Sequence, residues 1–404
     1  MSSRTLPIVS SLLARKSIAR TTATAMAHGW SGTSSVVPSI HRSVPIPLHT
    51  EWIPPEACES RIDKANNTDE HYTVLFLHGL LGSGRNLKTF ARKVVQQQSS
   101  NQGSCRGGIL VDLRGHGTSF RTQKREEHSL GKDQANEKYG TACTFSDCAR
   151  DIEHTLQQTL RADENENANG NENESGSSQP SLQPPPPPAR VLVGHSFGGR
   201  LALEYAAGVA ETQPLKALWL LDTVPGEANE TVDRVLATIA NVLEDNKNNR
   251  SNDIDSDIDN DSTTPPPTKK EIVSVLTEPP HGMDPPTAQW LAMSYDEKSG
   301  DNFGFDNDLV TRLKPEFRDQ DFHGLLRKVL AATETKNKTK TKNKTQVHVV
   351  RGGKNTGWSI PILSELEAVR REFPTNFHLH VLPSTGHNVH IDDLQGLVKL
   401  FEGR

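Results

Sequence analysis

At 404 residues the chain is long enough for one large α/β domain, but only 33% of it is hydrophobic, so much of the length must lie outside a core. The formal net charge of -5 excludes a basic field for nucleic acid, and no apolar run approaches the roughly 18 residues of a membrane span. Four cysteines without CxxC or histidine-linked spacing exclude a disulfide framework and a zinc site, and we expect reduced thiols, no metal and no cofactor.

The first fifty residues contain no Asp or Glu, but they carry several Arg and Lys among many Ser and Thr. This composition predicts a disordered transit peptide over residues 1–50. The stretch "SLLARKSIAR" can form a basic amphipathic turn and no apolar segment follows it. The predicted destination is therefore the mitochondrial matrix. A plastid destination, or an ordinary tail on a cytoplasmic protein, stays open.

Residues 71–225 alternate strand and helix signals and form the first part of a predicted core. Short apolar runs predict buried strands, and amphipathic runs predict helices. In chain order these are a strand over 72–79, a helix over 86–97, a strand and loop over 107–117, a helix over 145–160, a strand over 189–196, a helix over 197–208 and a strand over 215–225. The polar and proline-rich stretch 162–189 predicts a disordered insertion.

The second part of the core is predicted over residues 346–404. It contains a strand over 346–353, a helix over 362–373, a strand over 377–383 and a final helix over 393–401. Two low-complexity insertions, 244–270 and 333–346, precede it. Short apolar strands that alternate with amphipathic helices predict a parallel sheet covered on both faces, with functional groups at the carboxyl ends of the strands.

Ser196 lies at such a strand end, in the sequence "VLVGHSFGGRL". Residues 194–198 satisfy G-x-S-x-G between a predicted strand and a predicted helix, which is the context of a nucleophile elbow. Side chains two residues to either side of the serine would collide on so sharp a turn, which explains Gly194 and Gly198. We therefore predict that Ser196 is a nucleophile and not merely a small residue in a turn.

A serine hydroxyl needs a base to take its proton, and a histidine near the end of the chain is the expected partner. His387 follows the last predicted strand on a loop that begins "STGH". His390 is the rival, but it lacks the preceding glycine and lies three residues nearer the final helix. We predict His387 as the base.

The oxyanion of an acyl-transfer reaction needs hydrogen-bond donors that are already in place. The glycine-rich loop "HGLLGSG" ends the first core strand and can present backbone N–H groups. We assign the oxyanion hole to the amides of Leu80 and Phe197. The same loop lacks the Lys-Ser/Thr ending of a phosphate-binding loop, which speaks against a nucleotide site.

The base needs a carboxylate to fix its tautomer. Asp222 stands at the carboxyl end of the strand after the nucleophile, and Asp308 in "NFGFDND" is the rival. The loop "RGGKNTGWS", after the strand over 346–353, contains no acid. We favour Asp222 because a strand end is more rigid than a loop.

The motifs "LHGLLGSGRNL", "VDLRGHGTS", "VGHSFGGRLAL" and "STGHNVH", in this order, resemble those of the α/β-hydrolase superfamily. Three further features resemble the abhydrolase domain-containing protein eleven group and the bacterial YbfF-type esterases: "LLDTVPGE", "WLAMSYDEKSGDNFGFDND", and "RGG" with no acid after it. The resemblance implies the α/β-hydrolase fold, which is a mostly parallel central sheet flanked by helices. It also implies a helical cap, over residues 226–345, inserted after the strand that follows the elbow.

The same resemblance implies a metal-free serine hydrolase that cleaves carboxylic esters or thioesters of small acyl substrates through a Ser-His-Asp triad and an acyl-enzyme. In the group the acid has been placed at the positions of both Asp222 and Asp308, so the resemblance leaves that choice open. Asn388 stands where an aromatic residue is common, and Asp306 where Asn is usual. These departures concern the substrate pocket more than the triad.

Cap helices are expected over 230–243 and 288–295, where Trp290, Phe303 and Phe305 would either line an acyl pocket or form the core of the cap. Two alternative functions remain. A MenH-like lyase shares the glycine-rich loop and the elbow, but the missing acid after "RGG" speaks against it. A noncatalytic binding protein on this fold is opposed by the complete set of nucleophile, base and oxyanion loop. The oligomeric state is not predicted.

Overall fold

The computed structural model describes the residues that carry the predicted motifs. The described residues are 44–55, 72–102, 105–131, 134, 143–168, 189–213, 215–227, 230–252, 265–332 and 344–402. Most of the predicted leader and the central parts of the three predicted insertions lie outside this set.

One sheet organises the described part of the chain. Its seven strands are β1 (His49–Ile53), β2 (Tyr72–Leu77), β3 (Cys105–Asp112), β4 (Ala189–His195), β5 (Ala217–Leu221), β6 (Gln346–Gly352) and β7 (Phe377–Leu382). Their order in space is β1-β3-β2-β4-β5-β6-β7, with β1 antiparallel to β3 and the other pairs parallel. The parallel strands therefore bring their carboxyl ends to one edge of the sheet.

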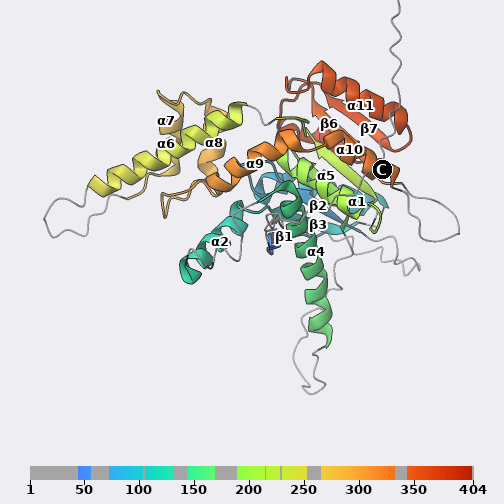
Figure 1. Ribbon diagram of the computed structural model, residues 1–404, viewed down its shortest axis with the longest axis horizontal. Coiled ribbons are helices and arrows are strands. Elements are labelled where there is room, and N and C mark those ends of the chain that lie inside the picture. Colours follow the sequence, from blue (N-terminus) through green and yellow to red (C-terminus); the bar gives the residue numbers. More distant parts are fainter. Residues whose placement is uncertain are drawn as a thin grey trace, which may run out of the picture. The chain divides into compact units, whose positions relative to one another are not determined.

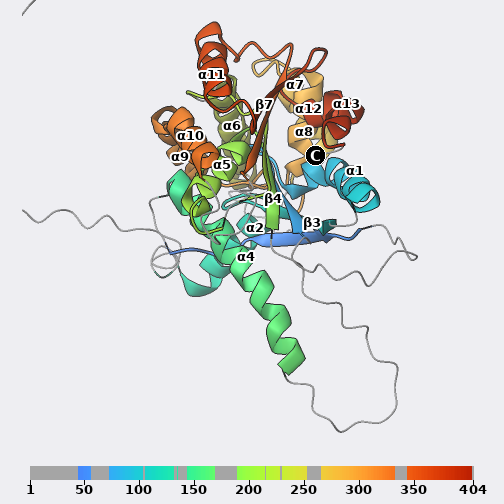
Figure 2. The same ribbon diagram turned by 90° about the vertical axis from the view of Figure 1, so that its right-hand side faces the viewer.

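Helices cover both faces of the sheet (Figure 2). One face carries α1 (Gly84–Gln102), α12 (Val389–Asp392) and α13 (Leu394–Leu400), and the other carries α4 (Phe145–Ala168), α5 (Phe197–Val209), α10 (Phe322–Ala331) and α11 (Ile360–Glu372). Side chains alternate along β2 accordingly: Val74 and Phe76 pack toward α1, whereas Leu75 and Leu77 pack toward α5. The predicted fold, a mostly parallel sheet flanked by helices, is confirmed.

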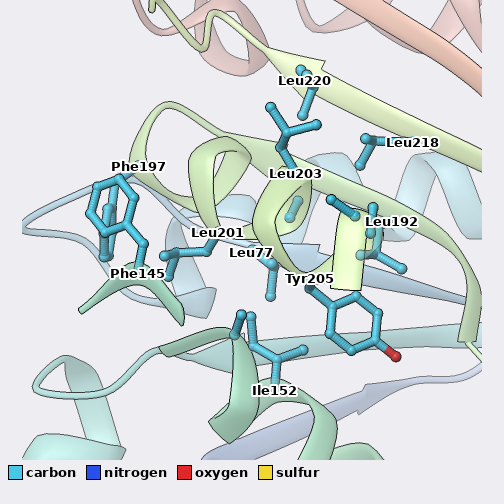
Figure 3. Close-up of a cluster of buried hydrophobic side chains, with 14 of the residues drawn as sticks. Leu77, Phe145, Ile152, Leu192, Phe197, Leu201, Leu203, Tyr205, Leu218 and Leu220 are labelled. Atoms are coloured by element: carbon cyan, nitrogen blue, oxygen red, sulfur yellow. The ribbon is translucent and has the colours of Figure 1, made fainter. Parts of the chain in front are cut away.

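Helix α5 is buried along almost its whole length (Figure 3). Its Leu201 and the preceding Phe197 pack against Leu192 of β4 and Phe145 of α4 in one apolar cluster. Small residues such as Ala202 let the helix lie close to the strands. Because the start of α5 is fixed by this packing, the turn that carries Ser196 is fixed with it.

The segment between β5 and β6 divides into two groups of helices. Helices α6 (Glu230–Asn252), α7 (Lys269–Thr277) and α8 (Pro285–Ser294), which we call the cap helices, share an apolar cluster of their own that is separate from the sheet (Figure 1). Helix α10 instead packs into the cluster on the α5 face of the sheet. Helix α9 (Asn307–Asp319) does so through three of its buried side chains, while its Val310 packs in the cap cluster. Only part of the predicted cap segment, 226–345, therefore stands apart from the core.

Some predicted boundaries were wrong. Strand β1 uses the last two residues of the predicted leader, 1–50, and Ile46 and Leu48 before it are buried. As an antiparallel edge strand with polar residues in it, "HTEWI" lacks the apolar run by which a buried strand is recognised. The leader itself stays a prediction for residues outside the described part.

Two helices also run further than the sequence indicated. Helix α4 continues to Ala168 and α6 to Asn252, so each enters a predicted insertion. The tail of α4 contains Glu and Ala, which are good helix formers, so its polar sequence is compatible with a continuing helix. Helices α2 (Gly117–Leu130), α7, α9 and α10 were not predicted as elements.

Candidate active site

Ser196 occupies the sharp turn between β4 and α5. Its backbone has φ 54° and ψ -116°, a conformation that is strained for a residue with a side chain. The Ser196 N–H donates to the carbonyl of Leu221 at the end of β5, with an N···O distance of 2.9 Å. The strained turn is thus tied to the neighbouring strand and presents the serine at the carboxyl edge of the sheet.

The two glycines of the motif are required by close backbone approach. A Cβ on Gly194 would collide with the carbonyl oxygen of Gly198, and a Cβ on Gly198 would collide with the carbonyl oxygens of Leu77 and His78. The collision expected from the sequence is therefore confirmed, and its partners are the elbow itself and the end of β2.

Asp222 follows β5 and is fully buried. Its Oδ2 accepts from Nδ1 of His387 at 2.7 Å and from the amide of Asn355, while its Oδ1 accepts from the N–H of Gly352 at 2.8 Å and from Nε1 of Trp358 at 2.7 Å. Four donors therefore hold one carboxylate, as a buried charge requires. Since Nδ1 of His387 donates to it, Nε2 of the neutral ring is left as the acceptor.

The two rival residues lie elsewhere. Asp308 is exposed in the first turn of α9 and makes no hydrogen bond to His387. His390 is buried beside His387, and its Nδ1 has no hydrogen-bond partner among the described residues. Burial lowers the pKa of His390 to about 4, with a further contribution from nearby His387. The structure therefore brings His387, and not His390, to Asp222.

The predicted oxyanion loop follows β2 directly. Buried His78 fixes its start: Nδ1 of the ring donates to the carbonyl of Gly79 at 2.8 Å, and Nε2 accepts from the N–H of Leu113 at 3.0 Å. Burial lowers the pKa of His78, which keeps the ring neutral as these two bonds require. Within the described part of the chain, the N–H groups of Leu80 and Phe197 have no hydrogen-bond partner, so both are free to donate to a ligand.

The proposed nucleophile, the base and the oxyanion loop border one cavity of about 650 Å³. Its wall includes Ser196, His387 and Asp222 at the carboxyl end of β5. An apolar set comes from the oxyanion loop, the cap helices, the loop after β5 and helices α1, α9 and α12: Leu80, Leu81, Leu87, Val224, Val232, Val235, Trp290, Phe317 and Ile391. Of the three aromatic residues considered for this pocket, Trp290 lines it. Phe303 and Phe305 are instead buried in the apolar cluster of the cap.

Arg200 on α5 also borders the cavity, with its guanidinium almost completely buried. Its Nη2 donates to the carbonyls of Val224 and Gly226, at 2.5 and 2.7 Å, and its Nη1 donates to the side-chain oxygen of Gln320 at 3.1 Å. Burial lowers the pKa of Arg200 to about 10. The side chain therefore ties α5 to the segment that leads into the cap helices.

Sequence reasoning missed the donors to Asp222. Gly352, Asn355 and Trp358 belong to the loop "RGGKNTGWS", which was noted only for its lack of an acid. The sequence did contain a signal for them, because a loop that is rich in hydrogen-bond donors and has no acid can bind a carboxylate at the end of the neighbouring strand. In the described residues, no three His, Cys, Asp or Glu side chains are placed to hold a metal ion, and no helix could span a membrane.

No curated protein matches the chain. Among solved structures, a marine microorganism esterase is 14% identical with a TM-score of 0.50, covering 88% of this chain and 97% of its own. The peroxisomal alpha-beta-hydrolase Lpx1 of Saccharomyces cerevisiae is 13% identical with a TM-score of 0.49, covering 88% and 86%.

An esterase of M. tuberculosis is 16% identical with a TM-score of 0.44, covering 89% of this chain and 92% of its own. At 14% identity, the likeness to the marine esterase indicates a shared fold and nothing finer. The profile of the alpha/beta hydrolase family, however, matches residues 74–400, which is most of the chain. With its parallel sheet and its strained serine elbow, the chain belongs to the alpha/beta hydrolase family.

Proposed function

We propose that this protein is a serine hydrolase that cleaves carboxylic ester or thioester bonds of small acyl substrates. Ser196 is the nucleophile, His387 the general base and Asp222 the carboxylate that orients the base. The observation that carries the proposal is the 2.7 Å hydrogen bond between His387 and buried Asp222, beside the cavity that Ser196 also lines.

In the proposed reaction, Nε2 of His387 takes the hydroxyl proton as the Ser196 oxygen attacks the acyl carbonyl. Asp222 stabilises the imidazolium that results. The N–H groups of Leu80 and Phe197 donate to the oxyanion of the tetrahedral intermediate. The proton then passes to the leaving alcohol or thiol, and a water activated by His387 hydrolyses the acyl-enzyme.

The lining of the cavity supports an apolar acyl group. Val232, Val235 and Trp290 form its cap side, whereas polar Asn355 and Asn388 lie in loops at the carboxyl edge of the sheet. An uncharged acyl chain can shed water against the apolar side, and the leaving group can remain near the polar loops.

We also propose finer membership in the group of abhydrolase domain-containing protein eleven and YbfF-type esterases, on the strength of "LLDTVPGE" and of an acid located after β5. Import into the mitochondrial matrix is a further proposal. It is supported by the acid-free composition of the first fifty residues.

The test is a panel of ester and thioester substrates given to the full chain and to Ser196→Ala. We expect the wild type to hydrolyse acyl substrates and the variant to lose at least about 1000-fold in kcat. Ser274→Ala, at an exposed position of α7, is the matched control and should retain full activity. A Ser196→Ala variant with unchanged activity contradicts the proposal.

Two other results would redirect the proposal. If the wild type releases product from a carbonyl substrate by elimination, without an acyl-enzyme, the protein is a lyase on this fold. If the folded wild type reacts with no member of the panel and no elimination substrate, the protein is a binding protein.

A further inference from the structure

Three histidine rings gather at the edge of the proposed site. The ring of His195, the residue before the nucleophile, lies with its centroid 4.9 Å from that of His387 and 4.5 Å from that of His390. His195 is 5% exposed. Its Nδ1 lies against the oxyanion loop, because a Cβ on Gly79 would come within 2.9 Å of it. The His195 ring therefore fills the space between the oxyanion loop and the loop that carries the base.

One hydrogen bond gives this ring a definite orientation. Nε2 of His195 lies 3.0 Å from the backbone carbonyl oxygen of His387. A carbonyl oxygen can only accept, so Nε2 of His195 must carry the hydrogen and donate it. A neutral imidazole has a single N–H, and this one is committed to the backbone of the base.

The surroundings keep His195 neutral. Burial lowers its pKa well below 6.5, and the neighbouring His390 and His387 rings lower it further. A neutral neighbour also avoids repelling the positive charge that the proposed reaction places on His387. The hydrogen bond is therefore available at neutral pH throughout the reaction.

The base needs such support because its side chain is half exposed, at 48%. Its loop is held locally by the Gly386 N–H, which donates to the Asp392 carboxylate at 2.7 Å. The bond from His195 differs from this local contact, since it joins the His387 backbone to the strand that carries the nucleophile. The distance between nucleophile and base is then set by adjacent residues, 195 and 196, of one rigid elbow.

We propose that His195 is a positioning residue, which holds the His387 backbone through Nε2–H so that the imidazole meets both Asp222 and Ser196. This inference rests on the proposed serine hydrolase function. It assigns to His195 no contact with the reacting atoms. Its effect is on the rate of the step in which the serine is deprotonated.

The test compares two amides of different reach. In His195→Gln the side-chain NH₂ lies about where Nε2 lay and can still donate to the His387 carbonyl. In His195→Asn the NH₂ lies about where Nδ1 lay and falls short. We measure the second-order rate of labelling by a fluorophosphonate, kcat and KM on one ester, and the melting temperature.

We expect His195→Gln to label within about threefold of the wild-type rate and His195→Asn to label about 10- to 100-fold more slowly, with KM little changed in both. His348→Gln is the matched control, a buried histidine of β6 that does not border the cavity, and it should label at the wild-type rate. A merely structural role would lower the melting temperatures of the Gln and Asn variants without separating their rates.

Two outcomes overturn the inference. One is wild-type labelling by His195→Asn, and the other is equally slow labelling by the folded Gln and Asn variants. If the wild type itself is not labelled, the proposed function fails instead, so the two failures are distinguishable. If one of the two variants does not fold, the labelling rate of the other is compared with that of the wild type, at a temperature below the melting points of both proteins.

Discussion

The loops after β5, β6 and β7, which we call the polar corner, and the cap helices border the same cavity but are held in different ways. In the polar corner, directional hydrogen bonds fix single atoms, as with the four donors to Asp222. In the cap, apolar side chains such as Ile239 and Leu291 pack together without directional bonds. The hydrogen bonds of the polar corner thus specify the angles and distances between catalytic groups, and the apolar packing of the cap specifies the volume and shape of the cavity.

The difference predicts two kinds of response to substitution. Removing one partner in the polar corner leaves a buried polar group unpaired and moves the base, so reaction rate should fall steeply. Trimming an apolar side chain in the cap changes the volume offered to a substrate, so selectivity should shift by smaller factors.

The largest expected effect comes from the two rival acids. We predict that Asp222→Asn lowers kcat about 10⁴-fold, because the amide oxygen stays with the Gly352 and Trp358 donors and the NH₂ group then faces Nδ1 of His387, which favours the wrong tautomer. Asp308→Asn, on the exposed start of α9, should stay within about twofold of the wild type. Steady-state hydrolysis of one ester by both variants makes the comparison. A steep loss in Asp308→Asn with an active Asp222→Asn would reverse the assignment.

The next effect concerns two glycines of the same helix, α5. Gly198→Ala places a Cβ against the carbonyls of Leu77 and His78 and should lower the free energy of unfolding by about 3 kcal/mol. Gly208→Ala meets no atom within 4 Å and should raise it by up to about 1 kcal/mol, because Ala favours the helix. Urea unfolding at one pH measures both. Equal effects in the two variants would show that the elbow tolerates a side chain.

A third prediction uses the acid sensitivity of helix α12, which follows the polar corner and carries His390. His390 has a pKa near 6.5 in the unfolded chain and about 4 in the folded protein. Between these two pH values the unfolded chain binds a proton at His390 and the folded protein does not. The contribution of neutral His390 to the free energy of unfolding is fully present above pH 6.5. It falls by about 1.4 kcal/mol per pH unit as the pH drops toward 4.

His390→Gln removes that titration, so its free energy of unfolding should fall less between pH 6.5 and 4.5 than that of the wild type. Urea unfolding at several pH values compares the two slopes. Parallel slopes for variant and wild type would mean that His390 does not stay neutral in the folded protein.

The smallest effect is expected in the cap. Trp290→Ala enlarges the cavity on its apolar side and should raise kcat/KM for longer acyl chains relative to shorter ones by about 3- to 10-fold. Phe303→Leu, in the buried cap cluster, is the comparison, and its chain-length preference should stay that of the wild type. A chain-length series of esters with a common alcohol gives the ratio. An unchanged ratio in Trp290→Ala would place the acyl group elsewhere in the cavity.

The sequence could predict those features of the fold and the site that depend on residues close together in the chain. Short runs of apolar residues and glycine predict the strand ends, the elbow at Ser196 and the loop of His387. The structure places these features at one edge of the sheet. Asp222 was favoured over Asp308 because a strand end is rigid, and it is the acid that bonds His387. These features depend on residues close to one another in the chain.

Other features depend on distant partners and could not be read in the same way. The bond from Asn355 to Asp222 joins the loops that follow two strands, β6 and β5, which pair only in the fold. The polar edge strand β1 is recognisable only beside β3. Likewise, α10 lies within the predicted cap segment but packs on α5, since its apolar face fits that layer. Amphipathic periodicity reveals that a face will be buried without identifying its partner.

The central claim is that the oxygen of Ser196 is the nucleophile, and locating the covalent adduct tests it most directly. The full chain is treated with a fluorophosphonate, digested, and examined by mass spectrometry for the modified residue. We predict a single adduct on Ser196, lost in Ser196→Ala and strongly slowed in Asp222→Asn. An adduct on another residue, or labelling that persists in Ser196→Ala, would contradict the account.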